Sequence, residues 1–313
     1  METPRTLTEA IRRYSDPGTC LSDVAEMRWP NGPVCPRCDA KGKSIAFMPT
    51  RGLWRCKACK KQFSVKIGTI FEDSPIGLDK WLTGMWLVNN CKNGISSYEL
   101  ARDIDVTQRT AWFMLHRLRL VMQTRSFSRP LGGEVEADET FIGGKARNMH
   151  AKERERKIRG RGPEGKAVVA AVLERHAEVR AHVIPSRKKK DVQKVVTDHV
   201  APGSELFSDA LKSYGGLENT YTHQVIDHAE AYVNGNIHTN GLENFWSLLK
   251  RGIHGTYISV EPFHLFRYVD EQAFRFNNRN GNDGDCFKTA LGNIAGRRLT
   301  YDEVRGKNLE IKA

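Results

Sequence analysis

The sequence of 313 residues has no long apolar run. No stretch approaches the roughly 18 uncharged apolar residues that a membrane-spanning helix requires, which excludes a transmembrane protein and a membrane partner. The N-terminal residues Met1–Arg5 lead into mixed polar sequence, without the apolar segment of a secretory signal. We therefore expect a protein that stays in the cytoplasm.

Acidic residues are scarce relative to basic ones. The chain has 37 Asp and Glu against 49 Lys and Arg, which gives a net charge of +12. Such an excess predicts attraction to a polyanion, although a basic soluble protein without such a partner has the same composition. With 39% hydrophobic residues the chain can bury a core, so wholesale disorder is excluded. At about 100–200 residues per domain, the length predicts two domains, or more if some are small.

Cysteine is sparse and odd in number. There are seven in all, and this count argues against a disulfide framework in a cytoplasmic protein. Four of them form two Cys-x-x-Cys pairs, at Cys35 and Cys38 and at Cys56 and Cys59, with seventeen residues between the pairs. A gap of about 15–20 residues lets a short hairpin bring two such pairs to one ion. We predict a structural Zn²⁺ site with four thiolate ligands and no open position for chemistry.

Two short helices follow the cysteines. Ser96, with Glu99 three residues later, is a start signal for the first helix, and Thr107 can cap the second. A pair joined by a few residues is typical of a helix-turn-helix, although ordinary helical regions contain such pairs too. In a DNA-binding arrangement, Gln108 and Arg109 would reach base edges. Two further arginines of the second helix, Arg117 and Arg119, would then lie nearer the phosphates.

The second half of the chain alternates strands and helices around three acidic residues. Asp138 lies on the first strand, Asp209 ends the fourth, and Glu243 is on the last helix. The expected order is strand 134–142, strand 166–173, strand 178–184, helix 187–200, strand 205–208, strand 223–226 and helix 240–251. This is the order of a ribonuclease-H-like fold, in which distant acids converge at one edge of the sheet. Carboxylates so placed could hold two Mg²⁺ or Mn²⁺ ions roughly 3.5–4 Å apart for phosphoryl transfer.

Each acid has an alternative. Glu136 or Glu139 could replace Asp138 as a ligand, and Asp227 could replace Asp209, which could instead cap a helix. Glu243 lies at capping-box distance from Asn240. However, Leu242, Phe245 and Leu249 form an apolar stripe that turns Glu243 and Lys250 to the other side of the helix. Lys250 would then approach a phosphate near the metal ions.

Several motifs resemble the ISXO2-like family of DDE transposases, which belong to small bacterial insertion sequences and carry an N-terminal zinc ribbon. The matching segments cover nearly the whole chain and are Cys35–Ser64, Gly68–Phe71, Ala137–Lys145, Ser208–Asp209, His238–Gly252 and Arg267–Asn277. The resemblance implies Asp138, Asp209 and Glu243 as the catalytic triad, with Asn244 as a lesser candidate for the third position. It also implies a bacterial cytoplasmic enzyme associated with DNA.

From the motifs and the resemblance together we expect a multidomain α+β protein. Its parts would be N-terminal helices and zinc ribbon (1–72), a helix-turn-helix region (73–128), a ribonuclease-H-like α/β catalytic domain (129–285) and a C-terminal tail (286–313). The transposase would bind the element's terminal inverted repeats as at least a dimer, cleave the ends, and join each 3′-hydroxyl to target DNA. The expected DNA-binding residues are Gln108, Arg109, Lys145, Lys250 and Arg251. Two alternatives remain: a zinc-ribbon and helix-turn-helix regulator without catalysis, and a ribonuclease-H-like nuclease or resolvase without strand joining.

Overall fold

The computed structural model describes residues 3–123, 129–144, 150–152, 155, 165–226 and 238–306. The chain divides into two compact units, one formed by residues 1–123 with 279–313 and the other by residues 124–278. None of the helices within the described ranges is long and apolar enough to cross a membrane.

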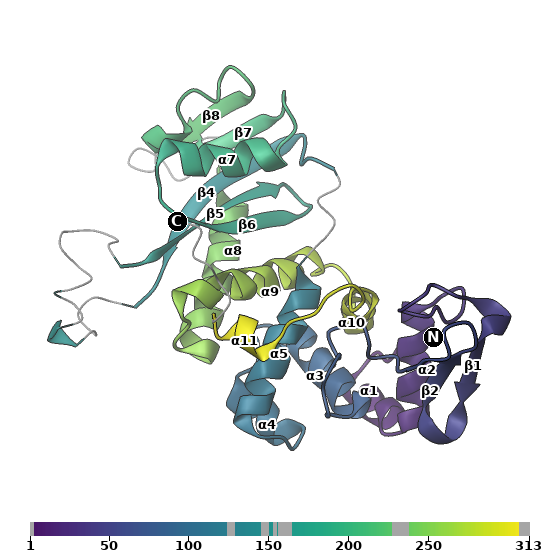
Figure 1. Ribbon diagram of the computed structural model, residues 1–313. Helices are drawn as coiled ribbons and strands as arrows, with labels where there is room; N and C mark the ends of the chain where they lie inside the picture. Colours follow the sequence, from purple (N-terminus) through teal and green to yellow (C-terminus); the bar gives the residue numbers. More distant parts are fainter. Residues whose placement is uncertain are drawn as a thin grey trace. The chain divides into compact units, whose positions relative to one another are not determined.

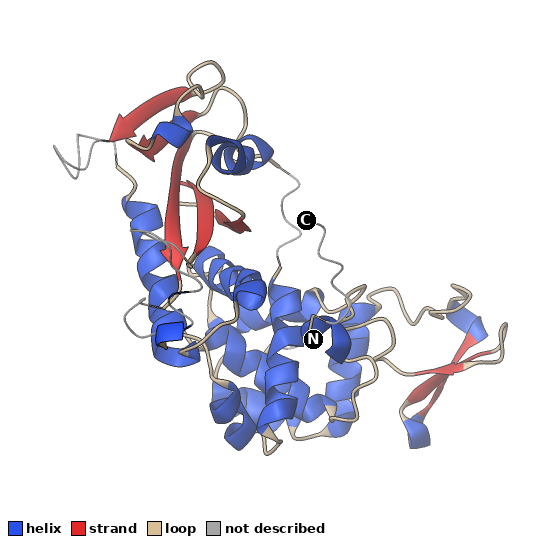
Figure 2. Cartoon of the chain, turned by 60° about the vertical axis from the view of Figure 1, so that its left-hand side comes forward, coloured by secondary structure: helices blue, strands red, loops and turns tan. Residues whose placement is uncertain are grey.

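The first unit is mainly helical, with a small sheet at its edge (Figure 2). Its elements are α1 (Leu7–Tyr14), α2 (Pro17–Arg28), β1 (Ile45–Met48), β2 (Leu53–Cys56), β3 (Gln62–Phe63), α3 (Leu78–Asn90), α4 (Ser97–Asp103), α5 (Gln108–Met122), α10 (Asp283–Gly292) and α11 (Tyr301–Val304). The three strands form an antiparallel sheet in the order β1-β2-β3. Trp54 of β2 stacks on Phe63 of β3 and meets the edge of Trp29 at the end of α2, so aromatic packing attaches the sheet to the helices.

The two helices predicted after the ribbon are confirmed as α4 and α5. The Ser96 hydroxyl accepts a hydrogen bond from the amide of Glu99 (3.1 Å), and the Thr107 hydroxyl accepts one from the amide of Thr110 (3.2 Å). These bonds satisfy amides that a helix N-terminus leaves without an intrahelical partner, which explains where both helices begin. One residue of the connection, Asp105, has a φ of 50°.

Arg117 and Arg119 of α5 are buried, so the prediction that they lie near phosphates is wrong. The Arg117 guanidinium donates to the backbone oxygens of Ile70 (3.0 Å), Glu72 (2.7 Å) and Leu299 (3.0 Å). It therefore joins three segments of the first unit that are far apart in sequence. Because a buried guanidinium must have its donors satisfied, Arg117 is a structural residue of this core.

The second unit is a five-stranded sheet with helices on both faces (Figure 1). Its elements are β4 (Glu134–Ile142), β5 (Ala167–Glu174), β6 (Val179–Ile184), α7 (Lys189–His199), β7 (Glu205–Asp209), a 3₁₀ turn (Lys212–Tyr214), β8 (Thr222–Ile226), α8 (Asn240–Arg251), a π-helical turn (Gly252–Tyr257) and α9 (Leu265–Asn277). The strand order is β6-β5-β4-β7-β8. β4, β7 and β8 are parallel, whereas β5 is antiparallel to both β4 and β6.

The two faces of this sheet bury different clusters. Val135 and Ala137 of β4 pack with α7, whereas Ala171 and Leu173 of β5 pack with α8 and α9. Asp138 lies opposite Ala171 in the β4–β5 register. Because side chains alternate along a strand, Asp138 therefore belongs to the face that α8 covers, and Glu139 belongs to the face of α7.

Candidate active site and metal centre

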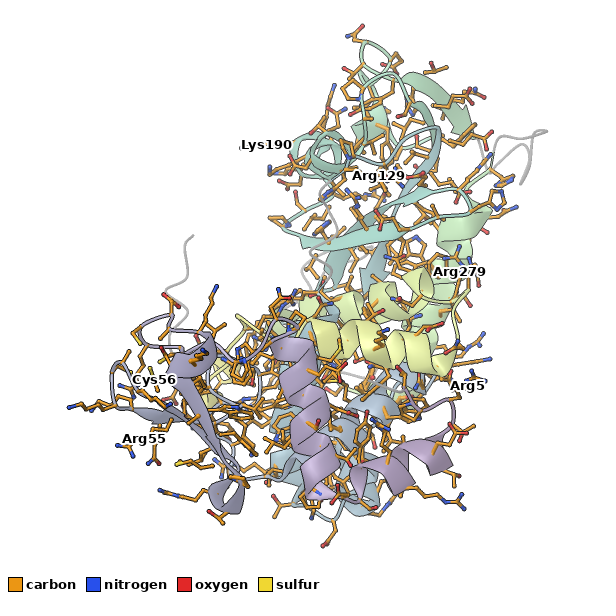
Figure 3. The ribbon with its side chains drawn as sticks, turned by 90° about the vertical axis from the view of Figure 1, so that its right-hand side faces the viewer. Arg5, Arg55, Cys56, Arg129, Lys190 and Arg279 are labelled. Atoms are coloured by element: carbon orange, nitrogen blue, oxygen red, sulfur yellow. The ribbon has the colours of Figure 1, made fainter. Side chains whose placement is uncertain are left out.

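The four predicted zinc ligands come together in the first unit. Cys35 and Cys38 precede β1, whereas Cys56 ends β2 and Cys59 lies in the turn before β3. Their sulfur atoms all lie within 4.8 Å of one another. Figure 3 labels Cys56, with Arg55 beside it on the same strand.

The spacing of these sulfurs fits a tetrahedral zinc ion. The Sγ atoms of Cys35 and Cys59 are 3.7 Å apart, and those of Cys38 and Cys56 are 3.6 Å apart. Zn–S bonds of about 2.3 Å in a tetrahedron separate two sulfurs by about 3.8 Å. Four thiolates complete such a coordination shell, so the residues fit a structural zinc ion.

Asp138 is held in the middle of β4 by two hydrogen bonds. The indole Nε1 of Trp246 on α8 donates to one carboxylate oxygen (2.8 Å), and the amide of Glu139 donates to the other (2.8 Å). Burial raises the pKa of Asp138 to about 6, and the charges of Asp209 and Glu243 act in the same direction. The other two predicted triad residues therefore each lie within electrostatic range of Asp138.

Asp209 and Glu243, the other two predicted triad residues, lie on different elements from Asp138. Asp209 is the last residue of β7, and its carboxylate accepts a hydrogen bond from the amide of Leu211 (3.1 Å). Glu243 is exposed in the first turn of α8. Since β4 and β7 are adjacent parallel strands, the topology brings Asp209 to the same part of the sheet as Asp138.

The carboxylates of Asp138, Asp209 and Glu243 lie farther apart than the ligands of a single ion. Within the described residues, the only three or more His, Cys, Asp or Glu ligand atoms within 4.8 Å of one another are those of the four cysteines. Two ions about 3.5–4 Å apart, each with Mg–O bonds of about 2.1 Å, span ligand oxygens up to about 8 Å apart. The neighbouring acids add to the raised pKa of Asp138, and a divalent cation bound there would relieve this repulsion.

Known protein families match both the part of the chain that contains the acids and the part that contains the four cysteines. The pattern of an ISXO2-like transposase domain matches residues 130–277, and that of a transposase zinc-ribbon domain matches residues 16–62. The chain belongs to the ISXO2-like transposase family.

Two relatives have names from mobile elements. A Halobacterium salinarum protein, described as an uncharacterized protein in transposable element ISH50, is 29% identical over 242 residues, which are 73% of this chain and 80% of that protein. An uncharacterized transposase-like protein of Haemophilus influenzae is 27% identical over 97 residues, which are 31% of this chain and 78% of that protein.

A fourth carboxylate, Glu139, lies beside Asp138 and Asp209. Burial raises the pKa of Glu139 to about 7, and the charges of Asp209 and Asp138 add to the shift. The buried Tyr214 hydroxyl donates a hydrogen bond to Glu139 (3.1 Å), and the Arg187 guanidinium lies 3.9 Å from it. Glu139 was an alternative to Asp138 in sequence, and the two carboxylates belong to opposite faces of β4.

Glu136, the other alternative, is engaged in holding α8. Its carboxylate accepts a hydrogen bond from the amide of Leu242 (2.9 Å) and one from the Arg175 guanidinium (3.2 Å). It thereby satisfies an amide in the first turn of α8, where the residue before the helix, Thr239, makes no side-chain cap. Because Glu136 is 1% exposed and occupied in this way, it is a positioning residue for α8.

Gly241 allows this close approach of α8 to the sheet. A Cβ atom on Gly241 would lie 2.4 Å from the Cδ2 atom of Leu173 and 2.8 Å from a Glu136 oxygen. Both distances are far below van der Waals contact, so a side chain here would push α8 away from β4 and β5. No sequence motif considered above assigned a role to Gly241.

The two predicted base-reading residues have partners within the first unit. The Gln108 amide donates to the Ser97 hydroxyl (2.8 Å). The Arg109 guanidinium donates to the Tyr301 hydroxyl (2.9 Å) and lies over the Tyr301 ring, 4.9 Å from its centroid. Tyr301 begins α11, so residues near the C-terminus contact the start of α5 in this transposase.

The remaining predicted DNA contacts lie in the second unit. Lys250 is half-buried and Arg251 is exposed, and both are in the last turn of α8. Lys250 lies seven positions after Glu243, a rise of about 10 Å along the helix axis. Two sequence candidates, Lys145 and Asp227, lie outside the described residues.

Sequence reasoning missed the contact roles of Glu136, Arg175 and Trp246. The only signal in the sequence was position: Glu136 shares a strand face with Asp138, and Trp246 is three residues after Glu243. Trp246 is buried. Its hydrogen bond to Asp138 gives it a further role, because groups that bond to a metal ligand fix that ligand's orientation.

Proposed function

We propose that the chain is a DDE-type insertion-sequence transposase that cleaves DNA ends and joins them to target DNA. The second unit supports this, because its strand order β6-β5-β4-β7-β8 has the connectivity expected of a ribonuclease-H-like domain. The observation that carries the proposal is geometric. β4 and β7 are adjacent parallel strands, which brings Asp138 and Asp209 to the same part of the sheet. Trp246, one turn after Glu243 on α8, donates a hydrogen bond to Asp138.

Asp138, Asp209 and Glu243 would hold two Mg²⁺ or Mn²⁺ ions. Bound ions of this kind activate an attacking oxygen and stabilise a leaving oxygen in phosphoryl transfer. Asp138 would be the best oriented of these ligands, because it lies on a central strand and accepts a hydrogen bond from Trp246 (2.8 Å). Glu136 and Gly241 fix the first turn of α8, and so they set the position of Glu243 relative to β4. The alternative Asn244 is exposed on the same helix.

The first unit would recognise the ends of the element. The zinc ribbon provides a rigid basic module, and α4 with α5 would form a helix-turn-helix in which Gln108 and Arg109 face bases. For Arg109 to read a base, it would have to exchange its contact with Tyr301. We also propose that Lys145, Lys250 and Arg251 bind phosphates and that the protein acts as a dimer or larger oligomer on DNA. Its DNA partners would be the element's terminal inverted repeats and target DNA. The chain would divide into four parts, with boundaries after residues 72, 128 and 285.

Cleavage of element-end DNA in the presence of Mg²⁺ tests the proposal. Asp138→Asn, Asp209→Asn and Glu243→Gln should each lose cleavage, because an amide cannot replace a carboxylate as a charged metal ligand. The matched control is Asp198→Asn, which changes an acid on α7 that pairs with Lys194 (2.8 Å). This control should cleave like the wild type.

The result also separates the alternatives. If Asp138→Asn cleaved as well as the wild type, the proposal would be wrong. Binding of DNA ends without metal-dependent cleavage by the wild type would favour the regulator. Cleavage without joining of precut ends to target DNA would favour the nuclease.

A further inference from the structure

A cluster of basic side chains lies at the start of α7, outside the triad. We call it the α7 basic surface: Arg187, Lys188, Lys189, Lys190 and Lys212. All five residues are exposed. Figure 3 labels Lys190 at the N-terminal end of α7, where it points away from the sheet.

Four lysines make up most of the α7 basic surface. Among the residues that the structure describes, none of Lys188, Lys189, Lys190 and Lys212 forms an ion pair. One turn further along α7, by contrast, Lys194 pairs with Asp198 at 2.8 Å. Adjacent positive charges repel one another, and an anion bound over them would offset this repulsion.

Hydrogen bonds fix the α7 basic surface to the loop that follows Asp209. The Ser213 hydroxyl donates to the backbone oxygen of Arg187 (2.8 Å). The side-chain Nε2 of Gln193 on α7 donates to the backbone oxygens of Ser213 (3.1 Å) and Gly215 (2.9 Å). The start of α7 is therefore held to this loop at Ser213 and Gly215.

The same surface adjoins the acids. Arg187 is 3.9 Å from Glu139, and Glu139 lies within electrostatic range of both Asp138 and Asp209. Lys189 extends over the loop, because a Cβ atom on Gly216 would be 2.9 Å from its ammonium nitrogen. Through Arg187 and its contact with Glu139, the α7 basic surface thus adjoins the acids on the α7 side of the sheet.

We propose that the α7 basic surface binds the phosphate backbone of the DNA strand that enters the triad. This inference rests on the proposed function, and it adds a binding site to it. Ammonium groups on flexible stems suit phosphate oxygens without reading bases, so the site holds DNA of any sequence. Arg187, beside Glu139, marks the end of the surface nearest the acids.

The test measures binding of the zinc-loaded full chain to a 30-base-pair duplex of random sequence without added Mg²⁺ or Mn²⁺, across a range of salt concentrations. The variant Lys188→Ala/Lys189→Ala/Lys190→Ala should weaken binding at 0.15 M salt by at least about tenfold. The slope of log affinity against log salt should fall by about 2 to 3, since each lost phosphate contact removes about 0.9. Lys190→Ala alone should lower the slope by about 1.

Lys194→Ala is the matched control, because it removes a lysine from the same helix whose charge already has a partner. It should leave the slope unchanged. All variants must show the wild-type circular dichroism spectrum and thermal midpoint. If the folded triple variant kept the wild-type slope, or Lys194→Ala lowered it equally, the inference would be overturned.

The outcome is separable from that of the proposed function. Binding without added Mg²⁺ or Mn²⁺ does not depend on catalytic metal ions, so Asp138→Asn should keep the salt slope of the wild type. If cleavage required Asp138 while the triple variant bound normally, only this inference would fail. If the triple variant lost binding while cleavage did not require Asp138, the surface would stand and the proposed function would fail.

Discussion

The indole nitrogen of Trp246 donates a hydrogen bond to the carboxylate of Asp138, at 2.8 Å, across 108 positions of sequence. Together with the bond from the Leu242 amide to Glu136, it attaches α8 to β4 at two points, one on either side of Glu243. The position of one proposed metal ligand relative to another is therefore fixed by contacts that do not involve the metal ions. Such pre-formed ligand geometry spares the cost of ordering the carboxylates at the moment of metal binding.

Replacing Trp246 by Phe should impair catalysis more than stability. The change keeps an aromatic ring against the core and removes the bond to Asp138, so we expect cleavage to fall by about 10- to 100-fold. The Mg²⁺ concentration required for half-maximal cleavage should rise. The control is Trp86→Phe on α3, a buried indole in the other unit, which should leave that concentration unchanged. An unaltered Mg²⁺ requirement in Trp246→Phe would argue against this role.

Gly241→Ala should destabilise the second unit. The added methyl group would meet Leu173 and Glu136 at 2.4 and 2.8 Å, and relieving such overlap costs about 1–3 kcal/mol. Denaturant unfolding measures the change in the free energy of unfolding. Gly255→Ala is the matched control, because nothing lies within 4 Å of its added Cβ atom. Equal losses in both variants would show that backbone flexibility, and not the contact with β4 and β5, explains the effect.

Without added Mg²⁺ or Mn²⁺, the stability of the protein should depend on pH through Glu139. Its pKa in the fold, about 7, lies above the ordinary value of 4.5, so between these values the folded state holds the proton more tightly than the unfolded chain. The contribution of Glu139 to stability is therefore full below about pH 4.5 and is lost as the pH rises through 7. Glu139→Gln stays neutral, so its thermal midpoint should match the wild type at pH 4.5 and exceed it at pH 8.

Glu218 provides a control of opposite sign. Hydrogen bonds from the backbone amides of Glu218 and Gly216 lower the pKa of the exposed Glu218 carboxyl. Its ionised form is thus favoured in the fold, and that stabilisation is present at neutral pH and lost as the pH falls through the lowered pKa. Glu218→Gln should therefore be less stable than the wild type at pH 8, if it differs at all. A pH-independent difference for Glu139→Gln would contradict the burial argument.

Removing one zinc ligand should unfold the ribbon. Cys56→Ser leaves three thiolates where a structural zinc ion needs four ligands, and the metal contributes directly to the folding of such small modules. Atomic emission should find one zinc per wild-type chain and much less in Cys56→Ser. Cys91→Ser, outside the cluster, should keep its zinc. Loss of zinc from Cys91→Ser, or its full retention in Cys56→Ser, would contradict the assignment of the four ligands.

Local patterns were sufficient to predict many elements. The alternation of residues 134–142 predicted β4, and the Ser96 and Thr107 signals predicted where α4 and α5 begin. The spacing of the four cysteines predicted their cluster. These features depend on residues within a turn or a hairpin of one another, so their physical causes are present in the sequence itself.

The sequence by itself determined the ribbon, the strand and helix order, and the identity of the acids worth testing. Only the tertiary structure decided that Arg117 is buried, that Tyr301 contacts Arg109, and that Trp246 binds Asp138. Each of these outcomes depends on a partner more than 40 positions away, and no local periodicity specifies which distant group a buried polar side chain will meet. That choice follows from the packing of whole elements, since a buried donor must find whichever acceptor the fold brings to it.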